Sequence, residues 1–171
     1  MVEPARLIEL EMVLLNRHSI FDGPRKADAH KKVDRSAYVV LTRIDLDGPL
    51  SIGELSAALG LDTSTVNRQT AAMLKADLIE RIPDPDGGMA RKLAMTSEGA
   101  ARLAYARDRT VESLGRVMAG WTEDEAADFA RMLERFNRGI EALEGRPWPR
   151  PGDATTRPDD GQPRYADGSD A

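Results

Sequence analysis

The sequence predicts a mainly α-helical protein that carries one small β-hairpin, an α+β fold. Several segments place apolar residues three and four positions apart, the spacing of a helix buried on one side. Two pairs of capping residues, Ser51 with Glu54 and Thr122 with Glu125, mark the starts of helices. A run of turn-forming residues at 83–88 separates two short strand-like runs, which indicates a hairpin.

Composition limits the class of protein. The 171 residues suit one domain with a tail, and the net charge is −5. Residues 120–145 carry seven acidic and three basic side chains, whereas residues 31–109 carry eleven acidic and twelve basic ones. The overall charge therefore neither excludes nor supports DNA binding. No apolar run approaches the roughly 18 residues that span a bilayer, and no signal-peptide pattern begins the chain. We therefore expect a cytoplasmic protein without a membrane partner.

The first predicted helix covers about residues 5–21 and ends at Asp22-Gly23-Pro24. Its leucine, isoleucine, methionine and valine residues cover more than one face, so it needs partners on several sides. A second subunit is the natural source of these partners. A polar loop should follow at about 23–33.

A second helix should run from Asp34, its cap, to about Leu46, and Pro49-Leu50 could pair as a minimal strand. The capping box at Ser51 opens a third, short helix. Gly60 suits the left-handed backbone at its end, and Leu61 is expected to plug the turn. Asp62 or Thr63 can cap the next helix. Two short helices joined by a glycine-bearing turn predict a helix-turn-helix, with an ordinary helical hairpin as the alternative.

The helix predicted at 63–76 carries the chemistry of DNA recognition. A helical wheel puts Val66, Thr70, Met73 and Leu74 on the buried side. No acidic residue occurs from 63 to 76, although a merely solvated face would be expected to contain some. Hydroxyls near a helix start suit phosphates, and arginine or amide side chains suit base edges. The predicted DNA contacts on this helix are Ser64, Thr65, Asn67, Arg68, Gln69 and Lys75.

A hairpin directly after this helix predicts a wing. Strands are expected at 78–82 and 92–96, and Arg91 and Lys92 on the returning arm are predicted to touch phosphate or the minor groove. The DNA-binding module is therefore expected at about 34–96, and the fold is a winged helix-turn-helix.

Two further helices complete the predicted domain, residues 1–145. They should cover about 97–119 and 123–143, and the second has a regular apolar series from Ala126 to Leu143. An intramolecular core would explain this series. We favour dimerisation helices at about 5–21 and 97–143, because both segments lie outside the module and both need burial. Residues 146–171 are rich in proline and poor in apolar residues, so we expect a disordered tail.

Other chemistry has less support. An anionic or aromatic ligand could meet polar side chains on the helices that border the module, although these could equally be scaffold residues: Arg17, His18, Tyr38, Arg43 and Arg107. The chain has two histidines, His18 and His30, and no cysteine, so no metal site is expected. No catalytic set or phosphate-binding loop is identified, so neither an enzyme nor a cofactor is expected.

The ordered motifs resemble the MarR family of regulators over about residues 5–143. The matching pieces are the stretch 51–61, Ser64-Thr-Val-Asn-Arg, Leu78-Ile-Glu-Arg, Asp84-Pro-Asp and Met95-Thr-Ser-Glu-Gly. The resemblance implies a triangular homodimer with two winged modules on a pseudo-palindromic site, often released by a small, commonly phenolic ligand. The chain departs from the family at the wing tip, where Gly87 and Met89 replace the usual aspartate and arginine. Gln69 also stands where an aliphatic residue is common.

These observations predict a sequence-specific, double-stranded-DNA-binding transcriptional regulator, a homodimeric repressor that a small ligand could release. The alternative is a winged-helix dimerisation or protein-interaction module without specific DNA binding. Some methyltransferases carry such a module, but they also need a nucleotide-binding domain with a Gly-rich turn, which this sequence lacks.

Overall fold

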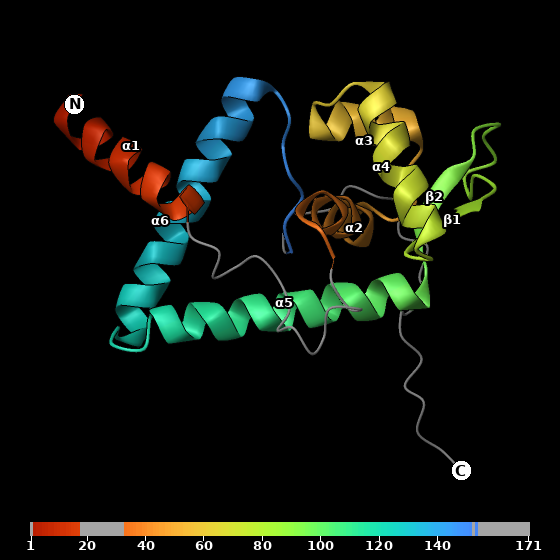
Figure 1. Cartoon of the computed structure of the whole chain (residues 1–171). Coiled ribbons are helices and arrows are strands. Elements are labelled where there is room, and N and C mark those ends of the chain that lie inside the picture. Colours follow the sequence, from red (N-terminus) through yellow and green to blue (C-terminus); the bar gives the residue numbers. More distant parts are fainter. Residues whose placement is uncertain (1, 18–32, 152, 154–171) are drawn as a thin grey trace, which may run out of the picture.

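The computed structural model describes residues 2–17, 33–151 and 153 and contains the predicted mainly α fold with one hairpin (Figure 1). The elements in chain order are α1 (Val2–Arg17), α2 (Arg35–Asp47), α3 (Ile52–Leu59), α4 (Thr63–Lys75), β1 (Ile79–Ile82), β2 (Lys92–Met95), α5 (Ser97–Val117) and α6 (Glu123–Glu144). The fold class is therefore confirmed.

A single apolar core holds the winged module together. Helix α2 lies at its centre and contributes four core residues, Ala37, Val40, Leu41 and Ile44. The remaining core residues come from α3, α4, the hairpin and the first part of α5: Leu55, Val66, Met73, Leu78, Ile79, Leu93 and Leu103. Aliphatic burial of this kind is the main stabilising contribution to folding. The module is thus a packed unit that presents α4 and the hairpin on its outside.

The predicted caps set the helix-turn-helix geometry. Ser51 and Glu54 form the expected capping box, and Gly60 ends α3 in the left-handed region at φ 63°. The Asp62 carboxylate caps α4. The expectation for Leu61 was wrong, because its side chain is 37% exposed. Both of its backbone groups bond to Ser56, with Leu61 N donating to Ser56 O at 3.2 Å and Ser56 Oγ donating to Leu61 O at 2.5 Å.

The wing is an antiparallel hairpin in which Ile79 pairs with Met95 and Ile82 pairs with Lys92. Leu50 forms the expected minimal third strand. Its N–H donates to Leu93 O at 3.1 Å, and Leu93 N donates back to Leu50 O at 2.7 Å. The base of the wing is therefore tied to the chain that precedes α3.

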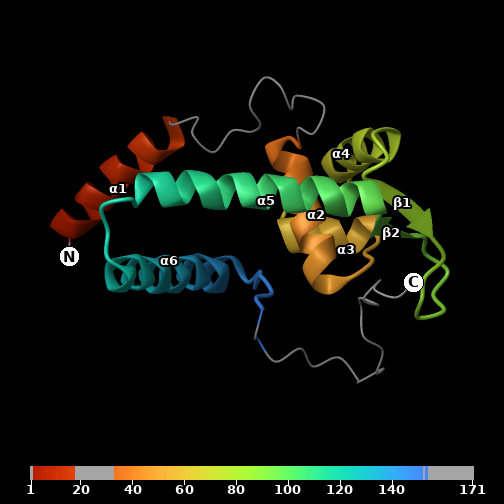
Figure 2. The same cartoon turned by 90° about the horizontal axis from the view of Figure 1, so that it is seen from below.

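A long arm extends from the module. Helix α5 runs beneath α2, and α6 leaves the far end of α5 at an angle (Figure 1). Helix α1 lies toward that same end, away from the hairpin (Figures 1 and 2). No residue of α6 is buried, and the described side chains of α1 also lack burial. No described helix has the length and hydropathy that would let it cross a membrane.

Two predicted boundaries differ from those that the structure describes. The helix expected at 5–21 is described as Val2–Arg17, and residues 18–21 and most of the polar loop lie outside the described residues. The sequence predicts a disordered tail from 146; the structure describes residues 146–151 and 153 of it, and these contact other elements. Arg150 binds Glu141, and Arg43 donates to Pro147 O at 3.3 Å. Composition cannot indicate these contacts, because Glu141 and Arg43 lie on other elements of the fold.

Candidate nucleic-acid interface

Helix α4 exposes the face that the helical wheel predicted. Val66, Thr70 and Met73 are buried and hold the helix on the core. Ser64, Asn67, Arg68 and Lys75 are exposed on the other side. Within the described part of the chain, neither Arg68 nor Lys75 has an acidic partner, so both charges face solvent. They stand seven residues apart, which is about 10 Å along a helix axis.

Asp62 organises the start of this helix. Its carboxylate accepts from Thr65 N at 2.8 Å and from the hydroxyls of Ser64 and Thr65 at 2.5 and 2.8 Å. These bonds, the Ser64 hydroxyl first, lower the pKa of Asp62, so the group is ionised at neutral pH. Both hydroxyl protons therefore point to Asp62. Direct donation to a phosphate would require the hydroxyls to turn away from it.

The two amides that flank the face differ in availability. Asn67 Nδ2 donates to Thr63 O at 2.9 Å, which orients its amide along the helix. Asn67 is exposed, and its side-chain oxygen Oδ1 accepts no hydrogen bond from the described residues, whereas Gln69 is half-buried. Asn67 is therefore the better placed of the two to reach a base edge.

Of the two basic residues predicted to contact DNA from the wing, one is exposed and the other is buried. Arg91 is exposed at the start of the returning strand. Lys92, in contrast, is 8% exposed. Its Nζ lies 3.3 Å from carboxylates of Asp84 and Asp86 and 3.6 Å from Glu54. Desolvation lowers the pKa of Lys92, but these three carboxylates outweigh it and raise the pKa overall. Lys92 thus ties the wing to α3, and its geometry does not favour a phosphate contact.

Two other wing residues are relevant to DNA. Met89, at the position of the family's usual arginine, is fully exposed. Arg81 on β1 is exposed and has no acidic partner among the described residues, although the sequence reasoning did not select it. The signal available in the sequence was a basic residue on the strand that directly follows the recognition helix.

The predicted ligand residues are mostly engaged with the protein. Arg107 binds Asp45 at 2.8 Å, and Arg43 binds Asp47 at 2.6 Å. Tyr38 is half-buried against the core. Arg17 is exposed at the end of α1, and His18 lies outside the described residues. The structure thus gathers Tyr38, Arg43 and Arg107 around α2, where both arginines are already neutralised.

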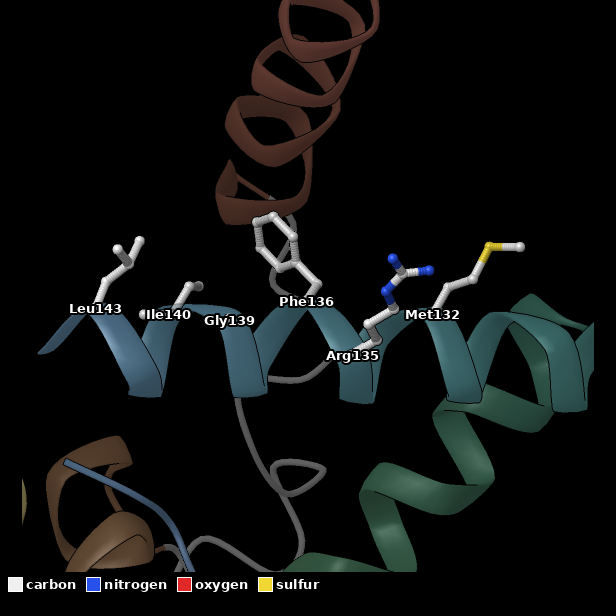
Figure 3. Close-up of a pocket in the computed structure, with 6 residues that line it drawn as sticks. All are labelled: Met132, Arg135, Phe136, Gly139, Ile140 and Leu143. Carbon is white, nitrogen blue, oxygen red and sulfur yellow. The ribbon is translucent and has the colours of Figure 1, made fainter. Parts of the chain in front are cut away.

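An apolar groove runs along the outer side of α6. It is lined by Met132, Arg135, Phe136, Gly139, Ile140 and Leu143, and the side chains of Met132, Phe136 and Leu143 point the same way (Figure 3). Phe129, Met132, Leu133 and Phe136 are exposed large apolar residues, and α1 adds Leu7, Leu10 and Leu15. Apolar surface on this scale marks a protein contact.

The core, the acid-free α4 face and the hairpin together define a winged helix-turn-helix DNA-binding protein. Comparison with known proteins narrows this class. Residues 33–87 match the model of the MarR family. The chain is 30% identical over 138 residues to the uncharacterised HTH-type transcriptional regulator YxaD of Bacillus subtilis, covering 80% of this chain and 95% of that protein.

Two further relatives agree with this result. The chain is 27% identical over 115 residues to the HTH-type transcriptional repressor IacR of Pseudomonas putida, covering 66% of this chain and 69% of the relative. A crystal structure of MarR superposes with a TM-score of 0.66 at 22% identity, covering 81% of this chain and 93% of that one. This chain belongs to the MarR family, and its function is DNA-binding transcriptional regulation. The alternative of an interaction module without DNA binding is not favoured.

Proposed function

We propose that the protein is a homodimeric repressor that binds a pseudo-palindromic operator through α4 of each subunit. The observation that carries the proposal is the outer face of α4, which exposes Arg68 and Lys75 with no acidic partner among the described residues, on a helix anchored by buried Val66 and Met73. Such a face suits the major groove, where base edges can be read by hydrogen bonds.

Each contact residue has a role that follows from its chemistry. Arg68 offers a planar pair of donors to guanine, and Asn67 or Gln69 offers an amide to adenine. Lys75, Ser64 and Thr65 bind phosphates, the two hydroxyls after turning from Asp62. Arg91 supplies the charge of the wing. We leave Lys92 out of the interface because three carboxylates already surround it.

The dimer is proposed from the exposed apolar surfaces of α1 and α6. A surface that pairs with a copy of itself about a two-fold axis buries both helices at once. The same axis presents two α4 helices to successive major grooves, so the half-sites should lie about one helical turn of DNA apart. This arrangement explains why the arm carries apolar residues that the module cannot cover.

Repression and ligand release are further parts of the proposal. The relative IacR is named a repressor, which supports that direction of control. A small anionic or aromatic ligand would bind near Tyr38, Arg43 and Arg107. The protein would act in the cytoplasm, where its DNA is found.

The test uses a duplex enriched from a randomised library by the intact chain. Arg68→Ala should weaken binding to that duplex by about 1–3 kcal/mol, with a smaller loss on random DNA, because the lost contact reads a base. Fluorescence anisotropy measures both affinities. Arg131→Ala is the matched control, since Arg131 is an exposed arginine on α6 paired with its neighbour Asp128. Equal affinity of Arg68→Ala and the parent for both duplexes would refute the assignment of α4.

A further inference from the structure

Residues 146–151, here named the strap, run back from the end of α6 toward α2 (Figures 1 and 2). Helix α6 ends at Gly145, whose φ of 65° reverses the chain. Glu141 then fastens the strap to α6. Its carboxylate accepts from both terminal nitrogens of Arg150, at 2.5 and 2.9 Å, and from Trp148 N at 3.2 Å. A bidentate arginine–carboxylate pair of this kind fixes the orientation of the two side chains as well as their distance.

The other side of the strap contacts the winged module. The Arg43 guanidinium on α2 lies 5.0 Å from the centre of the Trp148 ring, within the range of a cation–π contact. Arg43 Nη1 also donates to Pro147 O at 3.3 Å. The position of Arg43 is itself set by its bond to Asp47 at 2.6 Å. Trp148 is consequently held between α6 and α2.

Arg146 extends these contacts to the helix-turn-helix. Its guanidinium lies against Gly60, so closely that a Cβ at Gly60 would come 2.4 Å from Arg146 Cζ. Gly60 is the turn between α3 and α4. The strap therefore touches the element that sets the angle of the recognition helix.

These contacts matter because no described residue of α6 belongs to the buried core of the module. The core contains residues of α2, α3, α4, β1, β2 and α5, and none of α6. Along the chain, α6 joins the module only through α5 and the turn at 118–122. The strap closes the open side, so that α5, α6 and the strap with α2 make a triangle (Figure 1).

We propose that Arg146 and Trp148 are positioning residues that set the separation of the two recognition helices in the dimer; this rests on the proposed operator binding. Helix α6 has 22 residues, about 33 Å at the usual rise of a helix. A rotation of about 10° at one end of a 33 Å lever moves the other end by about 6 Å, more than the 3.4 Å between base pairs along a strand. Without the strap contacts, α6 could change its angle, and the dimer would bind operators with several half-site spacings. With the contacts in place, the dimer would bind only a few spacings.

The experiment measures tolerance of half-site spacing. The intact chain first enriches a duplex from a randomised library, and the spacer between the half-sites is then lengthened or shortened by one and two base pairs. Anisotropy titrations compare the full chain with Trp148→Ala and Arg146→Ala, while sedimentation and circular dichroism confirm dimer and fold. The controls are Trp148→Phe, which keeps a ring over Arg43, and Arg131→Ala, which removes an α6 ion pair outside the strap.

The parent should prefer the selected spacing at least tenfold, and either alanine variant should reduce that preference at least threefold. Trp148→Phe and Arg131→Ala should retain it. An unchanged preference in both alanine variants, or an equal loss of affinity at every spacing, would overturn the positioning role. If Trp148→Ala fails to fold, Arg146→Ala decides alone. Failure to enrich any duplex would contradict the proposed function instead, so the two failures are distinguishable.

Discussion

Gly99 lies at the start of α5, where the space above its Cα is filled by the backbone of Leu78. A Cβ at Gly99 would meet Leu78 O at 2.0 Å, a contact that a flexible side chain cannot relieve. Gly99→Ala should therefore lower the free energy of unfolding by about 1–3 kcal/mol, the usual effect of overpacking. Urea unfolding followed by circular dichroism measures the change.

Gly115 is the matched control on the same helix, because a Cβ there meets nothing within 4 Å. Gly115→Ala should raise the free energy of unfolding by up to about 1 kcal/mol through helix propensity. If both variants lose a similar free energy of unfolding, the close approach of Leu78 does not explain the glycine at 99.

Arg91 and Lys92 are neighbours with different expected effects on DNA binding. Arg91→Met should reduce the slope of log affinity against log salt by about 0.9, one phosphate contact, without changing thermal stability. Lys92→Met should leave that slope unchanged and lower the melting temperature, because Asp84, Asp86 and Glu54 lose their shared cation. If Lys92→Met lowers the salt slope and Arg91→Met does not, Lys92 belongs to the DNA interface and Arg91 does not.

The sequence predicts some residue roles and not others. The α4 face could be predicted because one helix determines which of its own residues share a side. The role of Lys92 could not be predicted, because its partners lie in the wing loop and, with Glu54, on α3. The contacts of Arg43 with the segment after α6 could not be predicted either. Its contacts with Pro147 and Trp148 span more than a hundred positions, and no local pattern indicates them.

At the scale of elements, local rules predicted most of the fold. The predicted capping residues at 34, 51, 62 and 122 locate four helix starts, and each cap accepts a backbone hydrogen bond in the structure. The strap was missed because its proline-rich composition resembles that of a disordered segment. Its order comes from two arginines and one tryptophan that meet partners on other elements.

The strap should open in acid because Glu141 loses its charge. The bonds from Arg150 are the main cause that lowers the pKa of Glu141 from 4.5 to about 2. Desolvation, the next largest effect, raises the pKa, and the bond from Trp148 N and the charges of Arg150 and Arg138 add to the lowering. A carboxyl with a depressed pKa contributes its stabilisation above the unfolded value, near 4.5, and loses it as pH falls through about 2. The contact should thus be intact at neutral pH and weaken below about 4.5.

Tryptophan emission can follow this opening. The chain has two tryptophans, so Trp121→Phe leaves Trp148 as the reporter. Its emission should be constant above pH 4.5 and shift between pH 4.5 and 2, while far-ultraviolet circular dichroism reports whether the helices persist. In Glu141→Gln the emission should match the open form at every pH. A pH-dependent shift of equal size in that variant would exclude Glu141 as the titrating group.

At the scale of the whole molecule, the exposed groove on α6 predicts how subunits associate. Ile140 lines the groove, and Ile140→Asp places a charge on the apolar surface proposed for dimerisation. The dimer dissociation constant should rise at least about tenfold, or 1.4 kcal/mol, as measured by sedimentation over a range of concentrations. Arg131→Ala, on the opposite side of α6, should behave as the parent. A parent chain that stays monomeric at every concentration would remove the basis of this prediction.

The absence of any buried residue in α6 has a consequence for regulation in a growing cell. In the proposed dimer, a second copy covers the apolar surface of this arm, so pairing is a precondition for reading two half-sites. At low abundance the occupied fraction of an operator then rises with the square of the number of chains rather than in proportion to it. Halving the concentration of the chain would lower occupancy about fourfold under that mass-action relation. The regulator would thereby respond to its own dosage as well as to any signal it receives.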